Sequence, residues 1–245
     1  QGLYRVSKRR PQLVKRVMRK GLERELPAGY DIDTHFTPRY NPWDQRVCAV
    51  ADGDLFRQIR NGKGDVVTDT VARFTETGIQ LGSGTELAAD IIVPATGLEL
   101  LFLGGVEMAV DGEKVNPADK LTYKGMMLEG VPNFAFTVGY TNASWTLKAD
   151  LSAEYVCRLL ITLRRRHVRQ CTPHNHDASV ADGPLLALNA GYIQRAIDRV
   201  PQQGNRFPWQ IHESYLKDYR AMKLSKVDDD AMAFTNPEPV GAARS

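Results

Sequence analysis

The sequence predicts an α/β protein, and three observations support this prediction. Residues 131–150 read as an apolar strand, a sharp polar turn and the first turns of a helix. Residues 86–97 carry a second apolar run that ends in small residues. The 245 residues are 42% hydrophobic and 25% charged, which is typical of a globular protein with one large domain or two small ones. Buried strands that end in a turn, one of them before a helix, are typical of α/β sheets, where cofactors bind beyond the strand ends.

The first third of the chain is expected to hold helices followed by a hairpin. A helix is predicted over residues 4–25, where an apolar stripe runs among Lys and Arg, and Pro27 and Gly29 end it. The other elements expected here are a helix at 53–63, a strand at 65–68 and a hairpin between 71–76 and 79–81.

Two apolar runs are expected to form buried strands. Residues 91–93 precede Pro94, which lacks an N–H group and limits pairing at that point. The small residues that follow would let a cofactor approach the backbone closely. Phe134, Phe136 and Val138 alternate with smaller residues in a run apolar enough to be covered on both faces.

A long helix is predicted from Trp145 onward, because Leu147 begins an apolar repeat of four residues that continues to Leu163. Thr141, Asn142 and Ser144 are suitable N-cap residues for it. The strand–turn–helix unit is either an edge that holds a cofactor or an ordinary core unit with a capped helix, and the spacing leaves both open. The segments expected after it are a polar loop at 170–183, short helices at 191–199 and 211–222, and a peripheral tail at 201–245.

Composition excludes several functional classes. The net charge of +3 is spread over short basic runs without a nucleic-acid-binding motif, so these runs are interpreted as solvated helix faces. No run of about 18 apolar residues predicts a membrane span. The three cysteines fit a reducing compartment, and a cytoplasmic location is expected. The spacing Cys171-x-x-His174-x-His176 lacks a fourth partner, so no metal site is predicted.

Three segments resemble, in their order and in their residues, the class B flavoprotein monooxygenases of the Baeyer–Villiger and flavin-containing type. They are YNPWDQR at residues 40–46, DIIVPATG at residues 90–97 and GYTNASWT at residues 139–146. The resemblance covers nearly the whole chain and matches the C-terminal half of the family. It implies two Rossmann-like domains that bind FAD and NADPH, a flavin peroxide formed with O₂, and a ketone or thio-compound as substrate.

The resemblance also implies domain boundaries. It assigns residues 1–41 to a helical segment, 42–93 to the last strands of the NADPH domain, 94–200 to the FAD domain and 201–245 to a peripheral tail. The Gly-rich fingerprints for both nucleotides belong to the family's first half. Within this chain only Gly82-Ser83-Gly84 approaches that pattern, and it lies in an expected hairpin turn. The chain is therefore expected to be a piece of a longer protein whose N-terminal half is its partner.

Site residues follow from the same resemblance. Arg46 matches the family's catalytic arginine, which stabilises the anionic peroxide, and a guanidinium keeps its charge for that task. Asp44 is expected to orient it; the alternative for Arg46 is a surface salt bridge. The residues expected to contact FAD are Thr96, Gly97, Asn142, Ser144, Thr146 and Lys148.

A further argument applies to each of Lys148 and Trp145, which follow the turn. Lys148 lies in the first helical turn, where a cation opposes the helix macrodipole, and an anionic reduced flavin nearby would explain it; a solvated lysine is the alternative. Trp145 matches the wall of the substrate pocket, with a core aromatic as the alternative.

Three functions stay open at this point. The chain is either half of an FAD- and NADPH-dependent monooxygenase or an inactive remnant that serves as an interaction module. Binding of nucleic acid through the basic runs is a weaker third hypothesis. Ketone oxygenation and sulfur or nitrogen oxidation are not separated by the sequence.

Overall fold

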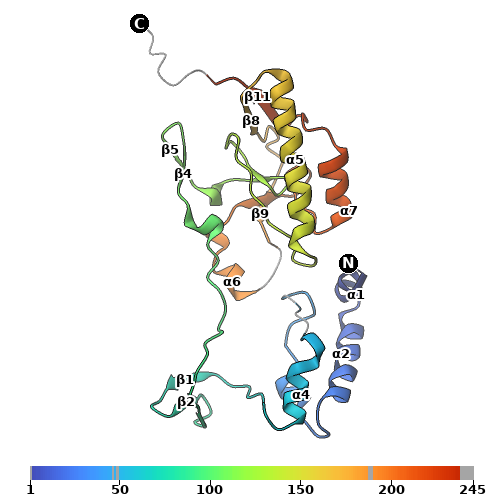
Figure 1. The fold of residues 1–245 in the computed structure, drawn as a ribbon, viewed down its shortest axis with the longest axis vertical. Coiled ribbons are helices and arrows are strands. Elements are labelled where there is room, and N and C mark those ends of the chain that lie inside the picture. The colour runs from blue at the N-terminus through green and yellow to red at the C-terminus, as the bar shows by residue number, and fades with distance from the viewer. Residues whose placement is uncertain (1, 46, 48–49, 187–189, 238–245) are drawn as a thin grey trace. The chain divides into compact units, whose positions relative to one another are not determined.

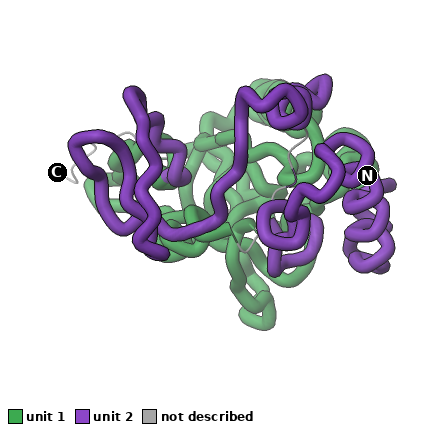
Figure 2. The backbone as a smooth tube through the Cα atoms, turned by 90° about the horizontal axis from the view of Figure 1, so that it is seen from below, with its two compact units in different colours: residues 1, 99–245 green, residues 2–98 purple. Residues whose placement is uncertain are grey.

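The computed structural model describes residues 2–45, 47, 50–186 and 190–237. They divide into two compact units, one formed by residues 2–98 and the other by the chain from residue 99 onward (Figure 2). The described chain mixes helices and strands, and every ladder between its named strands is antiparallel. No helix in the described ranges is both long and apolar enough to cross a membrane.

Unit 2–98 begins with the predicted helical segment, which is broken once. Helix α1 (Gly2–Arg9) ends before Pro11, and α2 (Pro11–Glu25) begins there, because proline has no N–H to continue the first helix. The small core of this unit consists of Leu26, Ile32 and Ile59. The shorter helices are α3 (Ile32–His35), η1 (Ala51–Gly53) and α4 (Asp54–Arg60).

A three-stranded sheet completes this unit and confirms the predicted hairpin. Strand β1 (Val71–Phe74) pairs with β2 (Gly78–Leu81), which pairs with β3 (Glu86–Ala88). A Cβ on Gly78 would overlap the backbone of Leu87, so the close approach of β3 requires glycine there.

Two strands predicted in this unit do not form within the described ranges. Residues 65–68 make no ladder; the Val66 side chain instead packs on the Leu26 core, and the Asp65 carboxylate accepts hydrogen bonds from Tyr30 Oη and Val66 N. Residues 91–93 are not buried, since Ile91 is 83% exposed and Val93 is 80% exposed. They are not in a ladder, and burial of a strand on both faces requires neighbours that these residues do not have.

The second unit is built around α5 (Trp145–Arg166), the long helix that the sequence predicts (Figure 1). Its repeat places Leu151, Tyr155 and Leu159 in the core, while Leu147 at its start is 39% exposed. Helix α7 (Tyr215–Asp218) and the π-helical turn η5 (Tyr219–Leu224) pack along α5 (Figure 1).

The strands of this unit form short antiparallel pairs. They are β4 (Met108–Val110) with β5 (Glu113–Val115), β6 (Thr122–Tyr123) with β7 (Met127–Leu128), β8 (Gln170–Pro173) with β11 (Met232–Thr235), and β9 (Asp182–Pro184) with β10 (Gln202–Gly204). The connecting turns are η2 (Phe102–Gly105), η3 (Pro117–Asp119), α6 (Gly191–Gln194) and η4 (Ile197–Arg199).

Three expectations for this unit need correction. Residues 131–138 form no strand in the described chain; Phe136 is buried as expected, but Ala135 and Thr137 are exposed, so only one face is covered. The loop expected at 170–183 contains β8, which pairs with β11. The segment expected to be a peripheral tail supplies Trp209, Met222, Val227 and Met232 to the core around Tyr155.

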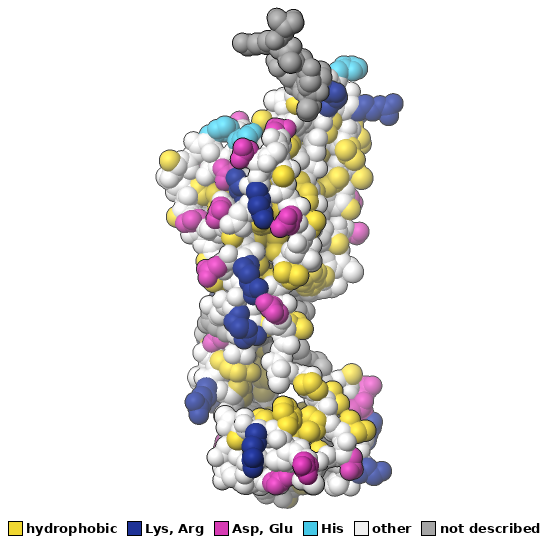
Figure 3. Space-filling view, turned by 90° about the vertical axis from the view of Figure 1, so that its left-hand side faces the viewer, with side chains coloured by type: hydrophobic (Ala, Val, Ile, Leu, Met, Phe, Trp, Pro, Cys, Tyr) yellow, Lys and Arg dark blue, Asp and Glu magenta, His cyan; other side chains and the backbone are white. Residues whose placement is uncertain are grey.

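Charge is distributed without a single dominant sign. On the face drawn in Figure 3, acidic and basic side chains are interspersed among apolar ones. This distribution agrees with the small net charge of +3.

Candidate functional site

The candidate site is the turn of residues 139–144 that leads into α5. Ser144 occupies the N-cap position, but its hydroxyl makes no capping bond. Ser144 Oγ instead lies 2.7 Å from Thr146 Oγ1, and both residues are at the surface. Both predicted contact residues therefore present hydroxyl groups at the start of the helix.

Trp145 lies over the backbone at the beginning of the turn. A Cβ on Gly139 would overlap the indole ring, so the ring and the chain approach as closely as only glycine permits. The side chain is 51% exposed and is not part of a core cluster. This exposure differs from that of a core aromatic, and the role of Trp145 as a pocket wall remains a prediction.

The middle of the turn is tied to Glu213. Thr141 N donates to Glu213 Oε2 over 3.1 Å, and Asn142 Nδ2 donates to Glu213 O over 3.0 Å. Asn142 Oδ1 is buried and has no hydrogen-bond partner among the described residues. A buried acceptor without a donor costs stability, so this oxygen is suited to an N–H group supplied by a ligand.

Glu213 is itself held in an unusual environment. Burial raises the pKa of its carboxyl group, and the hydrogen bonds from Thr141 oppose this shift. The same segment holds His212, whose pKa is lowered by burial and whose ring stacks on Phe207.

A buried ion pair lies beneath the turn. Lys148 Nζ is 2.9 Å from Asp218 Oδ2, and the two side chains are 2% and 4% exposed. Tyr140 Oη donates to the same Asp218 oxygen over 2.7 Å, and Lys148 Nζ also donates to Lys124 O over 3.2 Å. Burial lowers the pKa of Lys148, while the Asp218 charge opposes the shift. Asp218 thus joins α7 to the turn through Tyr140 and to α5 through Lys148.

A second buried lysine lies close to the first. Lys124 Nζ pairs with Asp229 Oδ2 at 3.0 Å and donates to Tyr155 Oη over 3.0 Å. Its ammonium also lies 4.9 Å and 4.5 Å from the ring centres of Tyr123 and Tyr155. Burial lowers the pKa of Lys124, and the charge on Asp229 opposes that shift. The two lysines therefore make a buried polar layer within an otherwise apolar core.

The turn fits a planar cofactor with hydrogen-bonding edges. Asn142 Oδ1 offers an acceptor, Ser144 and Thr146 offer hydroxyls, and the half-exposed Trp145 offers an aromatic face. The ammonium of Lys148 already pairs with Asp218 inside the chain. Asp218 therefore explains how a cation is accommodated in the first turn of α5, where it opposes the helix macrodipole. The contact of Lys148 with a flavin remains a prediction.

The remaining site residues belong to the other unit. Asp44 accepts from Lys8 Nζ over 3.1 Å and from Asn41 N over 3.1 Å. Arg46 lies outside the described residues. Thr96 and Gly97 are exposed in a segment without helix or strand, and Gly97 has a φ of +118°, which residues other than glycine rarely adopt.

Several polar residues of the site were not found by sequence reasoning. They are Tyr140, Glu213 and Asp218 around the turn, and Lys124 and Asp229 next to it. Asp218 is 70 residues from Lys148, and no local pattern links the two. A buried lysine on the apolar face of a helix was the one available signal, because such a charge requires a partner.

The chain is similar to several proteins that are named as FAD-containing or FAD-binding monooxygenases. No protein-family model matches the chain. It is 48% identical to "FAD-containing monooxygenase EthA" of Mycobacterium tuberculosis over 241 residues, which is 98% of this chain and 49% of that protein. EthA of Mycolicibacterium smegmatis is 45% identical over 242 residues, 99% of this chain and 49% of that protein. "Probable FAD-binding monooxygenase AlmA" of Acinetobacter baylyi is 43% identical over 234 residues, 95% of this chain and 47% of that protein. The chain thus spans about half the length of the relatives it matches.

Proposed function

Because the chain belongs to the FAD-containing monooxygenases, we propose that it forms the C-terminal half of an enzyme that oxygenates a small ketone or thio-compound with FAD, NADPH and O₂. The observation that carries the proposal is the sequence relationship over 98% of the chain. The relatives are named for FAD. NADPH, the two Rossmann-like domains and the substrate class rest on the motifs at residues 40–46, 90–97 and 139–146.

The proposal includes the N-terminal half of the same enzyme as the partner of this chain. Ile91 and Val93 are strongly exposed although they read as a buried strand, and residues 131–138 form no ladder in the described chain. Neighbouring strands from the other half would cover both segments and supply the phosphate-binding turns. Residues 42–93 then belong to the NADPH domain and residues 94–200 to the FAD domain.

The turn before α5 supports FAD binding in this assembly. When bound, FAD supplies the oxygen-transfer chemistry. Asn142 Oδ1 would accept from an N–H of the ring, Ser144 and Thr146 would hydrogen-bond to its edge, and Trp145 would bound the substrate pocket. Lys148 would keep a positive charge beneath this edge, held in place by Asp218. Thr96 and Gly97 would lie against the cofactor where the chain re-enters the FAD domain.

The catalytic charge in this proposal is Arg46, with Asp44 as its orienting partner. A fixed guanidinium beside a developing anion lowers the barrier without reorganisation during the reaction. Asp44 is paired with Lys8 in this chain, so orientation of Arg46 would require the carboxylate to contact both cations or to exchange them.

The test uses a chimera in which the N-terminal half of M. tuberculosis EthA is joined to this chain. We expect one FAD per chimera, NADPH oxidation with O₂ uptake, and an ester or sulfoxide product. The chain alone is expected to lose FAD on desalting. Arg46→Ala should keep FAD but lower the rate by ~10²–10³-fold, whereas Arg39→Ala in the same segment should not.

Two results would contradict the proposal. One FAD retained per chain without the other half would contradict the assignment as a half enzyme. A chimera that holds FAD and oxidises NADPH, but makes no oxygenated product from any ketone or sulfide in a panel, would contradict the assigned reaction.

A further inference from the structure

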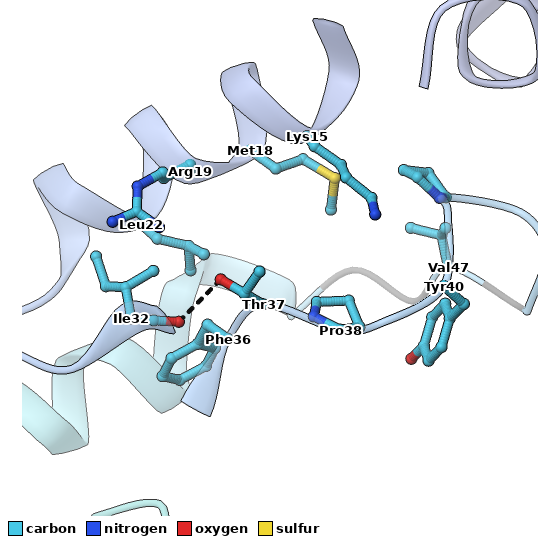
Figure 4. A pocket seen from close by; sticks show the side chains of 11 residues that line it. Lys15, Met18, Arg19, Leu22, Ile32, Phe36, Thr37, Pro38, Tyr40 and Val47 are labelled. Carbon is cyan, nitrogen blue, oxygen red and sulfur yellow. Dashed lines mark hydrogen bonds between the residues drawn. The ribbon is translucent and has the colours of Figure 1, made fainter. Parts of the chain in front are cut away.

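A separate cavity lies wholly within unit 2–98. It has a volume of about 270 Å³ and is lined by α2, by Ile32 at the start of α3 and by the segment that follows α3 (Figure 4). Figure 4 shows Lys15, Met18, Arg19 and Leu22 along the helix on one side, with Phe36 and Pro38 opposite. The cavity is distinct from the turn before α5, because the lining residues belong to residues 15–47.

The walls of this cavity are apolar. Met18 and Leu22 extend from α2, and Ile32, Phe36 and Pro38 face them (Figure 4). The hydroxyl groups of the lining belong to Tyr40, which is 43% exposed, and to Thr37, whose Oγ1 donates to Ile32 O over 3.1 Å. That hydroxyl is therefore used within the wall, and a hydrocarbon chain would meet few unpaired polar atoms.

The two cations of the lining differ in their partners. Arg19 donates to both carboxylate oxygens of Asp33, and to Glu23 over 3.1 Å, so its charge is matched inside the unit. Lys15 is partly buried and makes no hydrogen bond or ion pair within residues 2–45, 47, 50–186 and 190–237. One unmatched positive charge therefore borders an apolar cavity.

From this arrangement we propose that the cavity binds a monocarboxylate with an unbranched aliphatic chain. The carboxylate pairs with Lys15, and the chain lies between Met18, Leu22 and Phe36. A single free ammonium suits a monoanion. A phosphate dianion is disfavoured because Asp33 and Glu23 already neutralise Arg19 and add negative charge next to it.

The experiment measures binding to the whole chain by isothermal titration calorimetry, with octanoate, butyrate and octan-1-ol below micelle-forming concentrations. Burial of each methylene adds about four-fold in affinity, so octanoate, with four more methylenes, should bind roughly 250-fold more tightly than butyrate. Octan-1-ol should bind about ten-fold more weakly than octanoate, because it lacks the charge that pairs with Lys15.

Variants of α2 separate the cavity from the rest of the surface. Lys15→Ala should weaken octanoate binding about ten-fold and leave octan-1-ol within two-fold. Met18→Glu places a negative charge at the wall and should abolish octanoate binding. Lys20→Ala is the matched control, since Lys20 is exposed on the same helix and outside the lining. Far-UV circular dichroism of each variant should match the parent.

Four outcomes would overturn the proposal. Octanoate could fail to bind, octan-1-ol could bind as tightly as octanoate, or Lys15→Ala could bind octanoate as tightly as the parent. Tighter binding of an unrelated apolar peptide than of octanoate would also overturn it, because the cavity would then be a protein-docking groove. None of these measurements depends on FAD or on oxygenation.

Discussion

Replacement of Asp218 by Asn tests the polar layer beneath the turn. Asp218→Asn keeps the shape of the side chain and removes the negative charge from Lys148, which is buried to 2% exposure. Removal of one partner from a buried ion pair typically costs ~3–5 kcal/mol. The folded variant can limit this cost by releasing the lysine proton, and for an ordinary pKa of about 10.4 this costs ~4.6 kcal/mol at pH 7. Both routes predict a loss of unfolding free energy of ~3–5 kcal/mol.

The pH dependence of this loss gives a second readout. If Lys148 is neutral in the folded variant and charged in the unfolded chain, the unfolded state binds more protons, and stability rises with pH up to about 10.4. The defect at pH 9 should then be ~2.7 kcal/mol smaller than at pH 7. This direction agrees with the effect of burial, which already lowers the pKa of Lys148 in the paired state.

Urea unfolding followed by the fluorescence of Trp209 provides the assay. Trp209 is 3% exposed in the core of this unit, and replacing Trp43 and Trp145 by Phe leaves it as the reporter. Glu107→Gln is the control, because the Lys114–Glu107 pair is 74% and 83% exposed and should change stability by less than ~1 kcal/mol. A defect in Asp218→Asn below ~1 kcal/mol at pH 7 would refute the reasoning, and a defect that does not shrink at pH 9 would refute the release of the lysine proton in the folded variant.

Two further predictions concern neighbouring residues. Gly139→Ala should cost ~1–3 kcal/mol of unfolding free energy through overlap with the Trp145 ring and Cβ, and Trp145→Ala in the same chain, which removes the ring but keeps the Cβ, should recover only part of it; a silent Gly139→Ala would show that the Trp145 side chain is free to move. Burial lowers the folded pKa of His212 below its usual 6.5, so stability should fall as the pH drops through and below that value. His212→Gln should flatten the urea-unfolding profile between pH 7.5 and pH 5.5, and an equally steep profile in the variant would assign the acid sensitivity to other groups.

Elements with strong local patterns were predictable from the sequence. Helix α5 was found because its apolar repeat is a property of the segment itself, and the β1–β2 hairpin because Thr77 and Gly78 mark its turn. The apolar runs at 91–93 and 131–138 were read as strands by the same reasoning. A strand also requires a neighbouring strand, and in the described chain neither run has one.

The candidate site was predictable in part. The turn was identified from its N-cap residues, and Lys148 was singled out because its charge opposes the helix dipole. Its partner Asp218 and the contact of Asn142 with Glu213 join segments about 70 residues apart, and only the tertiary fold brings them together. The contribution of the C-terminal residues to the core was also missed. The polar composition of that segment does not show which few apolar side chains are buried.

The burial of two lysines has a practical consequence for chemical labelling. Amine acylation requires a neutral, accessible amine, and the side chains of Lys124 and Lys148 are 1% and 2% exposed. Both should resist a reagent that modifies Lys114, which is 74% exposed in the same unit. When the unit opens, both amines become accessible together. Mass-spectrometric mapping of their acylation would therefore report the integrity of the α5 core in a cell extract, without purification and without a bound cofactor.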